Sequence, residues 1–349
     1  MTLARQSAGR PVPAASGAPG APHAPHAPDA PDAPDVPDAP RSRNDRFPGF
    51  DGLRAIAALT VVGVHTAFAS GFTSKHAALG RYSSRLEIGV QVFFVISGFL
   101  LYRPFALSHL AGSPSPVTRQ FWTRRLRRIV PAYWVAFIVV TYLLHADDVH
   151  HSWDAPLIYL GFAQIYFPSY IIGGIKQAWS LGTEMSFYVV LPLYAALLRP
   201  AGPTARTAPL DRTAPLDRTP PTVRAPDRQL RRELVGLGLL TAISFAYRIP
   251  VLSVHSALTS AMPSWLPGYL DQFALGMLLA VVSAYLAATG RRPRLLWHAA
   301  TPWLCWAGAA VAFVAVSNLG LSVKPLAAPS MGQSLLRQTL YGAFAFLLV

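Results

Sequence analysis

The sequence predicts an all-α protein that crosses a membrane several times. Of its 349 residues, 52% are hydrophobic and only 13% are charged, and the mean hydropathy is +0.34. Apolar runs of about 15 to 20 residues recur along the chain, and about 20 such residues suffice for a helix to span the hydrocarbon core. This composition excludes an ordinary soluble domain and predicts a polytopic transmembrane helix bundle.

The first 46 residues have a different composition from the rest of the chain. Proline recurs about every third residue between positions 18 and 40, in steps such as Ala-Pro-His and Ala-Pro-Asp. Proline at this density prevents helix and sheet, and few apolar groups are present to offset the loss of chain entropy. Residues 1–46 are therefore expected to be a disordered tail with some polyproline II character.

Eight segments of the remaining chain, 47–349, are apolar and long enough to span. They are 53–72, 88–105, 129–145, 180–198, 234–250, 269–288, 299–317 and 335–349. A further piece, 157–167, is too short to cross comfortably and is expected to be re-entrant or interfacial. Residues 200–232 are rich in arginine and proline and are expected to form a flexible linker loop. The sequence stops at Val349 inside an apolar run, so either the last helix is short or the C-terminus is truncated.

The net charge of +14 is carried almost entirely by arginine. Nothing in the sequence resembles a nucleic-acid module, and the bias of basic residues toward cytoplasmic loops explains the charge better. If 157–167 does not cross, the basic segments 103–128, 199–232 and 291–294 all fall on the side of the tail. We therefore expect a multi-pass protein of the plasma or inner membrane with a cytoplasmic N-terminus. If 157–167 does cross, segment 199–232 faces outward.

Arg54 and His65 stand out in the first predicted span. They are eleven residues apart, so both lie on one helical face, about 16 Å apart along the axis. An ionisable group inside a span costs about 2.5–3.5 kcal/mol, and such groups usually face a bundle interior or a wet cavity. The near-neutral ordinary pKa of histidine suits removal of a proton from a hydroxyl. The alternative is that His65 only forms a hydrogen bond between packed helices.

Ser97-Gly98 lies in the second span. A pair of small residues allows close approach of two helices, and this interpretation is favoured here. A nucleophilic Ser97 is the alternative, but no nucleophile-elbow spacing supports it.

Arginines precede the third span. From spacing alone, Arg124, Arg125, Arg127 and Arg128 indicate contacts with anionic lipid headgroups and a topological signal. They could equally bind the phosphates of a nucleotide-bearing donor, since guanidinium matches phosphate oxygens in bidentate fashion. The spacing does not separate these two functions.

Glu184 is predicted near the outer end of its span, with Ser180 one turn away. A carboxylate at the depth of His65 could orient the imidazole, as the third member of a triad does. Alternatively, Glu184 pairs with a structural partner such as Arg248. Asp271 is a further intramembrane acid with the same ambiguity.

Together these segments resemble the acyltransferase-3 family of integral membrane O-acyltransferases. The resemblance covers roughly residues 47–349 and rests on several motifs in the family's order. The matching residues are the Asp-Gly-Leu-Arg opening at 51–54, the basic residue and histidine separated by ten intervening positions at Arg54 and His65, Phe-Phe-Val-Ile-Ser-Gly-Phe at 93–99, Arg-x-x-Arg at Arg125 and Arg128, Trp-Ser-Leu-x-x-Glu at 179–184, and 273–280.

The resemblance implies a bundle of about ten helices and transfer of an acyl group, commonly acetyl, from acyl-coenzyme A to a hydroxyl. Acceptors in the family are cell-envelope glycans, glycolipids or secondary metabolites such as macrolides. We accordingly expect His65 to be the general base, supported by Glu184 and Ser180. The residues expected to bind the donor's phosphates are Arg54, Arg124, Arg125 and Arg128. Acyl-coenzyme A is expected as a substrate, with no bound cofactor.

No metal site is expected either. The histidines and aspartates at 145–151 have suitable ligand types, but a hydrated outer loop accounts for them better.

Two rival functions remain open from the sequence. A transporter or flippase for a lipid-linked sugar could use the same intramembrane ions, as proton relays do. Against it, the two halves of the chain show no repeated hydropathy pattern and no matched pair of broken helices. A catalytically silent sensor or scaffold is the other alternative.

Overall fold

The computed structural model describes residues 47–144, 152–171, 173–200, 226–253, 261–291, 293, 298, 300–319 and 330–349. The predicted tail at 1–46, the loop at 145–151 and most of the predicted linker lie outside these residues. Within the described part the only regular secondary structure is helical, which confirms the all-α prediction.

The described helices account for every predicted span. Seven are long and apolar enough to cross a membrane, and α13 is an eighth of similar length. The long helices are α1 (Pro48–Ala69), α4 (Gly89–Ala111), α5 (Thr118–Ile138), α7 (Trp179–Leu198), α8 (Pro226–Ser253), α10 (Leu270–Thr289), α12 (Thr301–Asn318) and α13 (Met331–Leu348). The short helices are α2 (Phe72–Lys75), α3 (Ala77–Ser83) and α6 (Ala155–Leu160). The ten helices implied by the resemblance are not confirmed by these residues.

Two helices begin earlier than the hydropathy pattern predicts. Helix α5 starts at Thr118 instead of residue 129, so the arginine-rich segment is part of a helix and not of a loop. Arginine is a good helix former, and no glycine or proline interrupts residues 118–128. Helix α8 starts at Pro226, inside the predicted linker, because proline is well suited to a first helical position. A hydropathy pattern detects only the membrane-embedded part of each helix.

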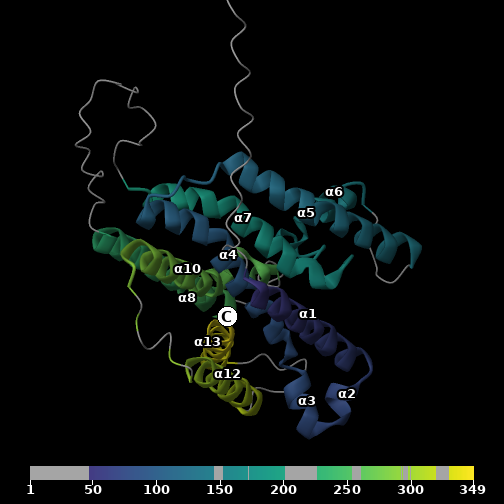
Figure 1. Cartoon of the computed structure of the whole chain (residues 1–349). Helices are drawn as coiled ribbons and strands as arrows, with labels where there is room; N and C mark the ends of the chain where they lie inside the picture. The colour runs from purple at the N-terminus through teal and green to yellow at the C-terminus, as the bar shows by residue number, and fades with distance from the viewer. Residues whose placement is uncertain are drawn as a thin grey trace, which may run out of the picture. The chain divides into compact units, whose positions relative to one another are not determined.

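Helix α4 is packed most extensively against α10 (Figure 1). The two run parallel, because Phe94 packs on Phe273 and, further along both helices, Arg103 Nε donates to Ser283 Oγ. Two glycines allow the close approach: a Cβ on Gly98 would collide with the carbonyl oxygen of Phe273, and a Cβ on Gly276 with that of Val95. This is the small-residue packing that brings membrane helices together. The structure thus confirms the predicted packing function of Gly98.

The other helices surround this pair. Helix α8 packs on α10, and α7 and α13 each contact α4. In the view of Figure 1, α5 and α7 lie above α4 and α10, whereas α12 and α13 lie below them. The segment 157–167 forms the six-residue helix α6 and a 3-10 turn at Gln164–Tyr166. Six residues extend only about 9 Å, so this segment does not span, as predicted.

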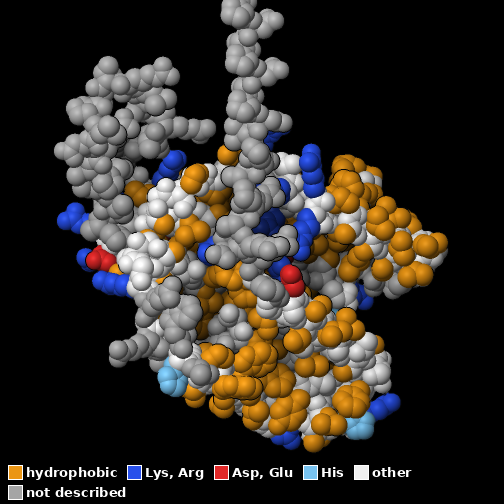
Figure 2. All heavy atoms as spheres, in the orientation of Figure 1, with side chains coloured by type: hydrophobic (Ala, Val, Ile, Leu, Met, Phe, Trp, Pro, Cys, Tyr) orange, Lys and Arg blue, Asp and Glu red, His pale blue; other side chains and the backbone are white. Residues whose placement is uncertain are grey.

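Large apolar side chains on the outer surface fit a lipid environment. Leu59 is 70% exposed, Leu193 63% and Trp303 77%. Figure 2 shows hydrophobic side chains over much of one face, with most of the lysine and arginine side chains gathered in its upper part. Such an extensive apolar surface would be costly in water and is expected in a bilayer.

Helix α1 lies antiparallel to α4 and is displaced along it. At one end, the ring of Phe50 packs on that of Phe99 with centroids 5.2 Å apart. At the other end, Gly63 lies against Leu86, which precedes the first residue of α4. The beginning of α1 therefore lies level with the middle of α4, and His65 lies beyond the first turn of α4.

Candidate active site

A half-buried carboxylate, that of Glu184, joins the middle of α4 to α7. Ser97 Oγ donates a hydrogen bond of 2.6 Å to Glu184 Oε1, and the Tyr188 hydroxyl donates one of 2.7 Å to the same oxygen. Ser97 is only 6% exposed, so water does not compete freely for this bond. Hydrogen bonds to an ionised carboxylate are among the strong ones in proteins. Glu184 is thus held in one place by donors from two helices.

Arg125 lies within electrostatic range of this carboxylate, and Arg54 lies within range of Arg125 and Tyr188. Arg125 of α5 interacts with Glu184, Tyr188 and Arg54, and Tyr188 interacts with both arginines. Arg54 also pairs with Asp51 at 3.7 Å, as its spacing predicts, although the Asp51 side chain is 86% exposed. We call Arg54, Ser97, Arg125, Glu184 and Tyr188 the Glu184 cluster; they come from four helices.

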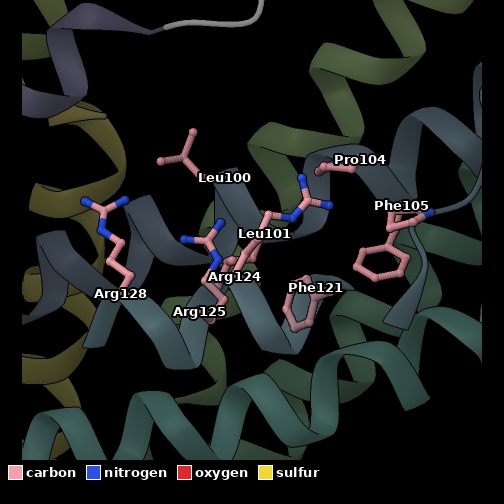
Figure 3. Close-up of a pocket in the computed structure, with 9 residues that line it drawn as sticks. Leu100, Leu101, Pro104, Phe105, Phe121, Arg124, Arg125 and Arg128 are labelled. Carbon is pink, nitrogen blue, oxygen red and sulfur yellow. The ribbon is translucent and has the colours of Figure 1, made fainter. Parts of the chain in front are cut away.

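The arginines of α5 line a cavity of about 490 Å³ between α5 and α4. Its lining residues are Leu100, Leu101, Pro104, Phe105, Pro116, Phe121, Arg124, Arg125 and Arg128, and none of these is acidic. Figure 3 shows the three guanidinium groups pointing from α5 to the same side, toward the cavity. Arg127 does not line it. We call this the arginine cavity; it has three cations, an apolar wall and no carboxylate of its own.

A hydrogen bond from a side chain of α5 to the backbone of α7 joins the helix of the arginines to the Glu184 cluster. Trp122 Nε1 of α5 donates to the Tyr188 carbonyl oxygen of α7 at 2.9 Å. Because Arg125 belongs both to the cavity lining and to the cluster, the cavity and the carboxylate form one continuous site.

The structure places His65 away from this site. It is exposed, and no hydrogen bond or ion pair reaches it from the part of the chain that the structure describes. The described residues therefore do not place His65 in the bundle interior or in a cavity, where an ionisable group of a span is expected. The reason is the displacement of α1, which buries Ala57 and Val64 against its neighbours and leaves the flank with His65 outside protein contacts. Arg54 lies on that same flank, about three turns away.

Glu184 is likewise not at the depth that the sequence predicts. It lies at the level of Ser97 and near Arg54, and the structure does not bring it to His65. Ser180 forms its hydrogen bond within its own helical turn, to the Gln177 carbonyl oxygen at 3.2 Å. Neither residue therefore contacts the predicted base in this structure.

The alternative partner considered for Glu184 is wrong as well. Arg248 forms a bidentate pair with Asp271, with Nη2–Oδ1 at 2.6 Å and Nη1–Oδ2 at 3.1 Å. Ser244 Oγ adds a hydrogen bond of 3.0 Å to the same carboxylate. Asp271 is thereby identified as half of a structural ion pair between α8 and α10.

Sequence reasoning missed two members of the Glu184 cluster. Ser97 is predicted to be a packing residue, whereas its hydroxyl binds Glu184; of the Ser97-Gly98 pair, it is Gly98 that lies at the close approach to α10. Tyr188 had a detectable signal, because it follows Glu184 by four residues and therefore shares its helical face. Another acid, Glu233, is fully buried near the start of α8; it accepts from Tyr102 at 2.5 Å and lies 2.7 Å from His109 Nδ1.

The chain matches a known domain family and is similar in sequence to known proteins. A family model described as an acyltransferase domain, the acyltransferase-3 family, matches residues 47–349. A peptidoglycan O-acetyltransferase of Listeria monocytogenes is 31% identical over 120 residues, which is 31% of this chain and 19% of that protein. An acyltransferase of Streptomyces mycarofaciens is 32% identical over 152 residues, 41% of this chain and 38% of that protein. No solved structure matches the chain.

The alignments with these relatives span less than half of each relative's length, whereas the family model spans the whole helical part of the chain. The long apolar helices and the order of the sequence motifs agree with that match. The protein therefore belongs to the acyltransferase-3 family, and its acyltransferase domain is a multi-pass bundle of membrane helices.

Proposed function

We propose that this protein is a membrane O-acyltransferase that moves an acyl group, commonly acetyl, from acyl-coenzyme A to a hydroxyl of a cell-envelope glycan, glycolipid or secondary metabolite. The observation that carries the proposal is the arginine cavity, with three guanidinium groups and an apolar wall at one continuous site with Glu184. Family membership supports acyl transfer as the reaction.

The arginine cavity matches the chemistry of the donor. Coenzyme A has several phosphates on one side and a long uncharged arm on the other. Arg124, Arg125 and Arg128 supply bidentate donors for the phosphates. Leu100, Leu101 and the other apolar lining residues offer a surface for the arm. Because the basic segments indicate the cytoplasmic side, the donor enters from the cytoplasm of a plasma or inner membrane.

Glu184 has a positioning function in this scheme. Held by Ser97 and Tyr188, it fixes a carboxylate within electrostatic range of Arg125. An arginine so restrained loses less side-chain freedom when a phosphate binds, which favours binding. This function differs from the predicted one, which is orientation of the His65 imidazole. The described residues show no contact between Glu184 and His65.

His65 is proposed as the general base. It takes the proton from the acceptor hydroxyl, and the hydroxyl oxygen attacks the thioester carbonyl carbon. The carbon–sulfur bond breaks, the new ester forms, and the proton passes to the departing thiolate, so the base is regenerated. His65 shares the flank of α1 with Arg54 at about 16 Å along the axis, a distance that the extended arm of the donor has to cover. No described residue covers His65, so an acceptor can approach it from the lipid-facing flank of α1.

The arginines provide the decisive experiment, because the chain offers a matched control. Membranes containing the full chain are incubated with radiolabelled acetyl-coenzyme A, and label in glycan and lipid fractions is measured against donor concentration. Arg125→Gln should raise the donor concentration required, whereas Arg127→Gln, two residues further along the same helix but outside the cavity lining, should not. Equal effects of the two variants would show that the arginines act in topology or lipid binding.

The same assay tests the rival transport function. Incorporation of label into an acceptor supports the enzyme. Uptake of a lipid-linked sugar into sealed vesicles without any labelled product would reject the proposed reaction. The name of the Listeria relative makes cell-wall glycan the first acceptor to examine.

A further inference from the structure

A second, smaller cavity lies between α8, α10 and α13. Its volume is about 110 Å³, and it is separate in its lining residues from the arginine cavity. The residues that line it are Tyr247, Arg248, Val251, Pro263, Gly268, Tyr269, Ser334, Arg337 and Gln338. We call it the α13 cavity. Two arginines and several hydroxyl or amide groups in so small a space indicate a polar ligand.

The two arginines of this cavity differ in their partners. Arg248 is neutralised by Asp271 and also donates to the Gly268 carbonyl oxygen from Nε at 3.1 Å. Arg337, by contrast, forms no ion pair or hydrogen bond with any residue that the structure describes. An arginine within a membrane bundle is costly unless an anion or a wet cavity receives it. Arg337 is therefore available for a ligand.

The balance of charge around the cavity is positive. Five charged residues act on the neighbouring tyrosines Tyr269 and Tyr341. They are Arg85, Glu87, Arg248, Asp271 and Arg337. Three positive and two negative charges leave an excess of one positive charge, and Glu87 accepts the Tyr341 hydroxyl at 2.8 Å.

An unsatisfied donor points to the same kind of ligand. Ser334 is 7% exposed, and its hydroxyl has no hydrogen-bond partner among the described residues. It lines the cavity and lies three residues before Arg337, on the same face of α13. A buried hydroxyl without a partner costs free energy that a bound acceptor atom would recover. A guanidinium and a hydroxyl side by side match the oxygens of a carboxylate or phosphate.

A layer of aromatic side chains separates the α13 cavity from the Glu184 cluster. Tyr269, part of its lining, packs on Trp179 with ring centroids 5.4 Å apart and on Phe94 with centroids 5.1 Å apart. Trp179 begins α7 one turn and a half before Glu184, and Phe94 precedes Ser97 by one turn of α4. The α13 cavity and the Glu184 cluster are therefore neighbours across these rings.

We propose that the α13 cavity binds an oxyanion, a carboxylate or phosphate, carried by the acceptor, with Arg337 and Ser334 as the ligand-binding residues. The inference rests on the proposed function for calling that molecule the acceptor. The acceptor is then an acidic molecule, such as a glycan with a carboxylated or phosphorylated sugar. The α13 cavity distinguishes acidic acceptors from neutral ones.

The test measures binding directly, so it does not depend on turnover. The purified full chain in lipid nanodiscs is titrated with glucuronate, glucose 6-phosphate and uncharged glucose, and binding is followed by calorimetry. We expect one or both acidic sugars to bind at least about tenfold more tightly than glucose, since a charge-assisted hydrogen bond contributes about 1.5–3 kcal/mol. A preference for glucuronate or for glucose 6-phosphate distinguishes the carboxylate from the phosphate.

Variants assign the binding to the cavity. Arg337→Gln should remove the preference for acidic sugars, and Arg231→Gln, an exposed arginine of α8 outside the cavity, should retain it. If Arg337→Gln does not fold, Ser334→Ala serves, with binding expected to weaken about three- to tenfold. Equal binding of all three sugars, no binding, or an unchanged preference in these variants would overturn the inference.

The outcomes separate the two proposals. Arg337-dependent binding in a protein that never transfers label from acetyl-coenzyme A supports the anion site and rejects the proposed reaction. Normal transfer of label with no anion binding at the α13 cavity supports the proposed reaction and rejects the anion site.

Discussion

The hydrogen bond between Ser97 and Glu184 allows a quantitative prediction about stability. The bond is 2.6 Å long, its acceptor is a carboxylate, and Ser97 is 6% exposed. Ser97→Ala removes this donor and leaves no room for bulk water to replace it. A hydrogen bond to a charged group contributes about 1.5–3 kcal/mol, so the free energy of unfolding should fall by about that amount.

Tyr188 is the second donor to Glu184 Oε1 and allows a second test of the same carboxylate. Tyr188→Phe should lower the free energy of unfolding by a similar amount, because its bond to Glu184 Oε1 is 2.7 Å long. The double variant removes both donors from Oε1, and it should lose more than the sum of the single variants, since residues that share one partner are coupled.

Ser180→Ala is the matched control for these variants. Its hydroxyl bonds only within its own turn, so its removal should change the free energy of unfolding by no more than about 0.5 kcal/mol. The assay is reversible unfolding in mixed detergent micelles, followed by tryptophan fluorescence. If Ser97→Ala loses no more stability than Ser180→Ala, the carboxylate is not held by Ser97 and the positioning function of Glu184 fails.

Three further substitutions test other parts of the structure. His65→Ala should abolish acyl transfer from labelled donor while unfolding shifts by no more than about 0.5 kcal/mol, because His65 is exposed; retained transfer would reject it as the base. Gly276→Ala should lower the unfolding free energy by about 1–3 kcal/mol or prevent folding, because its methyl group would meet the Val95 carbonyl oxygen; normal stability in the same unfolding assay would contradict the close α4–α10 contact. Glu233→Ala should lower the unfolding free energy by about 1–3 kcal/mol or more, because it leaves the buried Tyr102 hydroxyl and His109 ring without their hydrogen-bond partner, and a neutral result would show that these bonds contribute little.

The fold could be predicted well from the sequence because the hydrophobic pattern dominates it. Each long apolar run became a helix, and the short segment 157–167 was recognised as unable to cross. The ends of α5 and α8 could not be found in this way, because polar and arginine-rich residues extend a helix beyond the apolar run that reveals it. Helix propensity, and not hydropathy, determines those ends.

The site was predictable only in part, because it depends on how far one helix slides along another. The sequence places Arg54 and His65 on one face of α1, and this follows from helical periodicity alone. It does not fix the displacement of α1 against α4, which brings Arg54 near Glu184 and separates His65 from it. That displacement is determined by side-chain packing between segments distant in the sequence, such as Phe50 on Phe99.

The parallel pairing of α4 with α10 has a consequence for biogenesis. The two helices are separated by more than 150 residues, and α10 follows α4, α5, α7 and α8 in the order of synthesis. Until the translocon releases α10, Gly98 of α4 has no α10 surface to pack against. Maturation of the catalytic domain is therefore a late event after insertion, and nascent chains arrested before residue 266 should be recognised by quality-control proteases as unassembled.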